Sequence, residues 1–126
     1  MRLLILATIG GGIGAGARYL TQAAMIRWLG AGFPWWTFTI NILGSFLMGV
    51  VVTLVTLRFG ASNEIRTFLA TGILGGFTTF SAFSLDAAQL MDTQQPAAAA
   101  FYVGGSVVLS ILGLYMGLAL TKALLS

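Results

Sequence analysis

Long apolar stretches and short polar connectors alternate along the whole chain. Apolar residues dominate four segments, at positions 3–29, 36–57, 65–90 and 97–125. Each segment reaches the length of about 20 residues that a helix needs to cross the hydrocarbon core of a bilayer. The pattern therefore predicts an all-α, polytopic membrane protein with four transmembrane helices.

The connectors carry residues that end one helix and start the next. "GAGFP" (30–34) closes the first segment, and Pro34 suits the first turn of the second helix. In "RFGASNEIR" (58–66), Ser62 or Asn63 is the expected N-cap of the third helix. "DTQQP" (92–96) ends that helix. No connector has the length of a separate domain, so residues 1–126 are expected to form a single four-helix transmembrane domain.

Composition narrows the chemistry. The chain has no Cys and no His, which excludes thiolate catalysis, imidazole bases and the usual transition-metal sites. It also lacks a convincing pair of nucleophile and base, so we do not expect an enzyme. The charges favour termini in the cytoplasm by the positive-inside rule, because four cations lie at the end of the termini and one at the other end (Arg2, Arg58, Arg66 and Lys122 against Arg27).

Glycines recur at four-residue spacing in the first and last segments. The pairs are Gly10 with Gly14, Gly12 with Gly16, and Gly113 with Gly117. Small residues at this spacing let membrane helices approach closely. They indicate either packing within the bundle or an interface between subunits, and four short helices with little interior of their own favour an oligomer.

Several polar side chains lie at membrane depth, where they are costly. Arg18 is expected either to pair with a neighbouring helix or to attract anions to a vestibule. Asn41, with Ser45 one turn away, is either a bond between helices or part of a polar path. Ser106 and Ser110 are one turn apart, and isolated serines in membrane helices commonly bond the backbone one turn back.

The run "TGILGGFTTFSAFS" (71–84) combines two adjacent glycines, five hydroxyls and three phenylalanines inside the third segment. Gly75, Gly76 and the threonines after them predict an interruption of the helix. Backbone groups freed at membrane depth need partners, and carbonyls near Gly75 and Thr78 suit a hard cation. Phe80 and Phe83 share one helix face, which indicates packing when taken alone.

"GGFTTFSAFS" resembles the signature of the Fluc, or CrcB-type, fluoride ion channels. The resemblance extends to "GARY" in the first segment, to Pro34, Thr37 and Asn41, and to "GGSVVLSILG" in the fourth. It implies a channel of the cell inner (plasma) membrane that exports fluoride passively. It also implies an antiparallel, dual-topology homodimer with two pores and a structural Na+ at the two-fold axis.

The resemblance assigns roles to matching positions. It places the Na+ on the backbone carbonyls of Gly75 and Thr78, and Arg18 in a vestibule. It lines the fluoride pore with six residues: Asn41, Phe80, Phe83, Ser81, Tyr102 and Ser110. Four positions depart from the family pattern, namely Trp36, Ala82, Asp86 and Leu114. Ala82 and Leu114 each remove a hydroxyl on one flank of the expected pore.

Two other functions fit a small four-helix membrane protein. A small dual-topology transporter for cations needs an acid at depth, and the first segment contains none. A non-conducting assembly subunit would use the glycine faces for docking and the interruption as a kink. Fluoride conduction is the function that the resemblance favours over both.

Overall fold

The computed structural model describes all 126 residues and contains helices joined by short connectors. Three long helices are α1 (Arg2–Leu29), α2 (Trp35–Arg58) and α6 (Pro96–Leu125). The region between α2 and α6 consists of α3 (Asn63–Arg66), the π-helix η1 (Thr67–Leu74), α4 (Gly75–Phe77) and α5 (Ser81–Asp92). This confirms the predicted all-helical fold.

Four helical stretches are long and apolar enough to cross a membrane: α1, α2, the region 63–92 and α6. Their bounds differ from the predicted segments by a few residues. Ser62 caps α3 as expected, because its Oγ accepts a hydrogen bond of 3.2 Å from the Ile65 amide. Pro34 immediately precedes α2 instead of lying in its first turn.

The region 63–92 changes direction after α4. Residues 78–80 are not helical, and Thr78 is extended (φ −80°, ψ 158°). We predicted from the sequence that the interruption would also include Gly75 and Gly76. This prediction is wrong, because both residues are helical. A side-chain carbon added at Gly76 would lie 2.9 Å from the Gly11 Cα. Gly76 is therefore needed for close approach to α1 and not for an irregular backbone.

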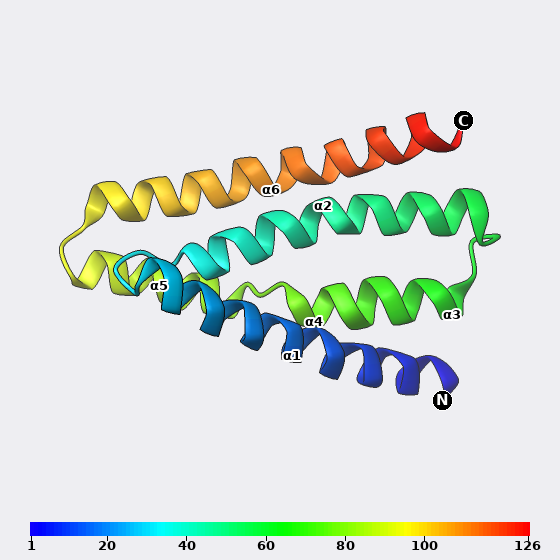
Figure 1. Ribbon diagram of the computed structural model, residues 1–126, viewed down its shortest axis with the longest axis horizontal. Coiled ribbons are helices and arrows are strands. Elements are labelled where there is room, and N and C mark those ends of the chain that lie inside the picture. Colours follow the sequence, from blue (N-terminus) through cyan, green and yellow to red (C-terminus); the bar gives the residue numbers. More distant parts are fainter.

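The helices pair in two sets. α2 packs mainly along α6, and α1 packs mainly on η1 and α4 (Figure 1). Both termini lie at one end of the molecule, whereas α5 and its connector to α6 lie at the opposite end (Figure 1). The main buried apolar cluster combines α2, α5 and α6 (Phe38, Phe83, Leu90, Ala99 and Tyr102).

The predicted glycine pairs have different surroundings. Gly10 and Gly14 are buried against η1 and α4, and Gly117 is buried against α2. A side-chain carbon added at Gly12 or Gly16 would meet no atom within 4 Å. Two of the three pairs therefore serve packing within the bundle, and the third faces outward.

Candidate functional site

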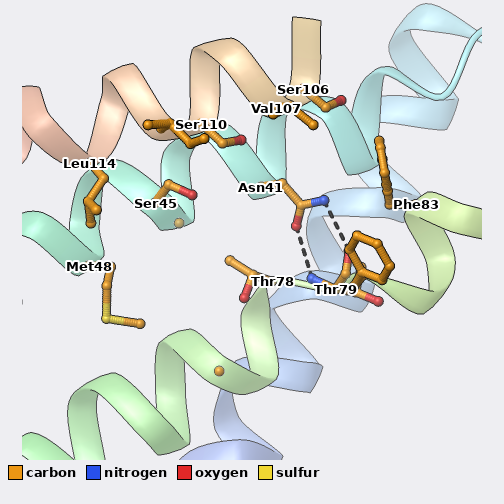
Figure 2. A pocket seen from close by; sticks show the side chains of 14 residues that line it. Asn41, Ser45, Met48, Thr78, Thr79, Phe83, Ser106, Val107, Ser110 and Leu114 are labelled. Atoms are coloured by element: carbon orange, nitrogen blue, oxygen red, sulfur yellow. Dashed lines mark hydrogen bonds between the residues drawn. The ribbon is translucent and has the colours of Figure 1, made fainter. Parts of the chain in front are cut away.

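A pocket of about 500 Å³ lies between α2, α6 and the non-helical residues 78–80 (Figure 2). Its lining contains no charged side chain, and its polar groups are an amide and hydroxyls. Fourteen residues line it: Asn41, Gly44, Ser45, Met48, Gly75, Thr78, Thr79, Phe80, Phe83, Ser106, Val107, Ser110, Ile111 and Leu114.

Asn41 holds the non-helical segment in place. Its Nδ2 donates to the Thr79 carbonyl (3.0 Å), and its Oδ1 accepts from the Thr79 amide (2.9 Å), as the dashed lines in Figure 2 show. Thr79 Oγ1 then accepts from the Ala82 amide at 3.2 Å, which caps the first turn of α5. A side chain of α2 thus satisfies backbone groups that the third membrane-crossing region leaves without a helical partner.

The carbonyls of Gly75 and Thr78 accept no hydrogen bond. In a continuous helix their donors would be the amides four residues on. The Thr79 amide donates instead to Asn41, and the Ala82 amide donates to the Thr79 hydroxyl. Gly75 is exposed and Thr78 is half-buried, and both line the pocket. Two free backbone oxygens on one wall fit a hard cation such as Na+.

Three serine hydroxyls in the pocket have no protein partner. Four other hydroxyls in the long helices, those of Thr8, Thr21, Thr53 and Thr56, donate to a carbonyl one turn back. Ser45 and Ser110 make no such bond, and Ser106 Oγ is buried with no partner. The bond to the backbone that is common for isolated serines is therefore not made here, and hydroxyl groups remain available inside the pocket.

Phe80 and Phe83 both reach the pocket but differ in burial. Their ring centroids are 5.6 Å apart, and the rings are inclined at 45°. Phe80 is 78% exposed, whereas Phe83 is 9% exposed and belongs to the main apolar cluster. Phe83 therefore packs within the fold, and Phe80 has little support from its own chain.

The structure brings six of the nine predicted site residues to this pocket: Asn41, Gly75, Thr78, Phe80, Phe83 and Ser110. The other three do not line it. Ser81 is exposed at the start of α5, with Oγ 3.4 Å from Thr79 Oγ1. Tyr102 is fully buried behind Phe83, with ring centroids 5.2 Å apart. Arg18 lies half-exposed on α1.

Three further residues shape the site without having been predicted to do so. The backbone of Thr79 accepts one hydrogen bond from the Asn41 side chain and donates another to it, and no local pattern indicates this partner 38 positions away. Asp86 Oδ2 accepts the Tyr102 hydroxyl at 2.9 Å. Met48 lines the pocket; its place one turn after Ser45 on α2 is the signal that could have identified it.

The pocket has no charged side chain, but it contains groups that suit an anion and groups that suit a cation. Hydroxyl and amide donors and the electropositive edges of two rings suit a small anion. The free carbonyls of Gly75 and Thr78 suit a cation. Since no full charge is present, the pocket can bind an ion and still release it.

The sequence is similar to a known protein family and to several named proteins. A family model described as "CrcB-like protein, Camphor Resistance (CrcB)" matches residues 5–118. A protein of Chelativorans sp. (strain BNC1) named "Fluoride-specific ion channel FluC" is 52% identical over 97% of this chain and 98% of that relative. Proteins of the same name from Rhodospirillum centenum and Mesorhizobium japonicum are 48% and 50% identical, and each alignment covers 97% of the relative.

Proposed function

The chain belongs to the CrcB-like family, and from this premise we propose that it is a fluoride channel whose ion path runs through the pocket between α2, α6 and residues 78–80. It is a multi-pass membrane protein, which in bacteria means the inner membrane. Its relatives are named as ion channels, which are not enzymes, in agreement with the expectation from composition.

The observation that carries the proposal is that Ser45 and Ser110, whose hydroxyls have no protein partner, line the pocket together with two phenylalanine rings. An unmade hydrogen bond in a low-dielectric site is expensive unless a ligand or water completes it. Fluoride is a small and strongly hydrated anion, so a pore must replace its water with donors of similar strength. Ser110 offers an O–H, and Asn41 retains one amide N–H that Thr79 does not use.

Phe80 and Phe83, which also line the pocket, add weaker attraction for the anion. The edge of a phenyl ring is electropositive, since the quadrupole places negative charge on its face. Two ring edges stabilise an anion without trapping it, which a lysine at the same depth would do. Ser81 and Tyr102 would join the path only after a side-chain movement, because neither lines the pocket.

The carbonyls of Gly75 and Thr78 would hold a structural Na+. They accept no hydrogen bond, and oxygen ligands of this kind suit the ion. A bound Na+ supplies a positive field that favours a nearby anion. Thermal unfolding in detergent tests this site without any transport measurement, since exchange of Na+ for N-methylglucamine should lower the midpoint. An unchanged midpoint would remove the ion from the proposal.

The functional unit would be an antiparallel homodimer with two pores. One side of the pocket is left open by the chain's own helices, and the outward stripe of Gly12 and Gly16 leaves room for a close neighbour. A single cysteine placed in the 58–66 connector of this cysteine-free chain tests the orientation. Labelling by an impermeant reagent from both sides of the membrane supports dual topology, and labelling from one side contradicts it.

Fluoride release from proteoliposomes tests the proposed function. Vesicles with the purified protein should lose fluoride rapidly down its gradient and retain chloride. Equal rates for the two halides would contradict selectivity. Dependence on a proton gradient would instead favour a coupled transporter, and absence of any flux would favour an assembly subunit.

A further inference from the structure

The polar lining of the pocket stops at one level on both long helices. The polar side chains that α2 contributes to the lining are Asn41 and Ser45, followed by Met48. On α6 they are Ser106 and Ser110, with Val107 and Ile111 beside them and Leu114 after them. Figure 2 shows Met48 and Leu114 together at the end of the pocket away from Phe83. Leu114 lies about 6 Å beyond Ser110 at 1.5 Å per residue. Both rows of donors therefore end in an apolar side chain at the side of the chain termini.

No hydroxyl of α2 replaces these donors further on. The next two hydroxyls along α2, those of Thr53 and Thr56, each donate 2.9 Å hydrogen bonds to carbonyls of their own helix. The helices also close together at this level. A side-chain carbon added at Gly49 would lie 2.9 Å from the Leu118 amide nitrogen, so α2 and α6 are in close backbone contact directly after Met48 and Leu114.

An anion that leaves Ser110 toward the termini must pass this level without a protein donor. An ion that loses hydration without new partners meets a barrier, and apolar constrictions in channels limit flow by excluding water. We propose that Leu114, with Met48 opposite it, forms a hydrophobic collar that limits fluoride flux at the termini side of the pocket. This inference rests on the proposed function, and Leu114 and Met48 act in it by excluding water and not by binding the ion.

Two variants of almost equal shape separate hydration from width. Thr and Val have the same branched outline, but Thr carries a hydroxyl. L114T is expected to raise the initial rate of fluoride efflux about fivefold, the value of one added hydrogen bond, while L114V stays close to the original protein. Fluoride efflux from proteoliposomes of equal protein content is the measurement, with chloride as the second ion.

Further variants control for folding and position. M48Q keeps the length of the side chain and adds an amide on the opposite helix, so it should also raise the rate. L109T adds the same hydroxyl at a residue that is 42% exposed and does not line the pocket, and it should change nothing. Gel filtration in detergent verifies that each variant remains folded.

The outcomes decide between the inference and its premise. A faster L114T with unchanged L114V and L109T supports the collar. The collar is overturned if L114T and M48Q both conduct at the rate of the original protein. If L114T and L114V accelerate efflux equally, the barrier depends on width, and the role of hydration is overturned. In each of these results the original protein conducts fluoride. If it does not conduct at all, the proposed function fails instead.

Discussion

Small residues line two regions of this protein with opposite results. In the first region, which we call the glycine contact, Gly10 and Gly14 of α1 touch the backbone of η1 and α4. In the second, the polar pocket, small residues of α2 and α6 line a cavity of about 500 Å³ together with residues 78–80 (Gly44, Ser45, Ser106 and Ser110). One set of small residues leaves no space, and the other surrounds an open space.

The difference shows that residue size alone does not identify a membrane pore. At the glycine contact, a side-chain carbon on Gly14 would lie 2.8 Å from the Phe77 amide nitrogen, so the backbones themselves fill the gap. In the pocket, the space is kept open because Asn41 holds residues 78–80 in their irregular path. The first region stabilises the fold, and the second leaves donors free for a ligand.

The largest expected effect comes from filling the glycine contact. G14V should prevent stable folding, because the side chain would enter backbone that cannot move aside, at a cost of about 3 kcal/mol or more. Gel filtration and thermal unfolding in detergent measure the loss. The matched control is G104V on α6, where an added carbon meets no atom within 4 Å. Equal stability of the two variants would contradict the distinction between these glycines.

The second-largest effect is expected from replacing the two phenylalanine rings that line the polar pocket. F83I and F80I should each reduce fluoride efflux about tenfold, since isoleucine has no electropositive edge. F83I should also lower the thermal midpoint, because Phe83 is part of the buried cluster, whereas F80I should leave it unchanged because Phe80 is 78% exposed. Normal flux in both variants with an intact fold would assign the rings to packing alone.

The fold was largely accessible from the sequence because lipid restricts the possible structures. Four apolar stretches of sufficient length must be helices, since no other open structure satisfies its backbone in hydrocarbon. The location of the non-helical residues was less accessible. The sequence suggested that Gly75 and Gly76 interrupt the helix. Both are helical, and Gly76 lies in close contact with Gly11 of α1.

The sequence indicated which residue types belong to the candidate site, but it did not indicate the contacts that these residues make. Asn41, Phe80, Phe83 and Ser110 line one pocket, and their roles in conduction stay predictions. The bond between Asn41 and Thr79 joins positions 38 apart and depends on how α2 crosses the third region. Likewise the burial of Tyr102 behind Phe83 follows from tertiary packing, which spacing along one helix cannot predict.

A smaller effect should come from releasing the segment that keeps the pocket open. N41A leaves the amide and carbonyl of Thr79 without partners, so fluoride efflux should fall about fivefold and the thermal midpoint should drop. S45A is the matched comparison on the same helix, since its hydroxyl makes no protein bond, and it should have the weaker effect on both measurements. The reverse order would mean that Ser45, and not Asn41, lies on the face that matters.

The smallest expected effect tests whether the unpaired hydroxyl of Ser106 contacts the ion or only lowers the stability of the protein. Ser106 Oγ is buried without a partner, which is unfavourable by itself. S106A should therefore raise the free energy of unfolding by about 1 kcal/mol. We expect fluoride efflux to stay within about twofold, because Ser106 is 4% exposed and lies deeper in the protein than Ser110.

The same substitution one turn away provides the contrast. S110A removes a half-buried hydroxyl that reaches the pocket, so it should lower fluoride efflux without a gain in stability. A variant S106A that is more stable yet conducts poorly would show that the buried hydroxyl also contacts the ion. The ion path through the polar pocket would then include Ser106 as well as Ser110.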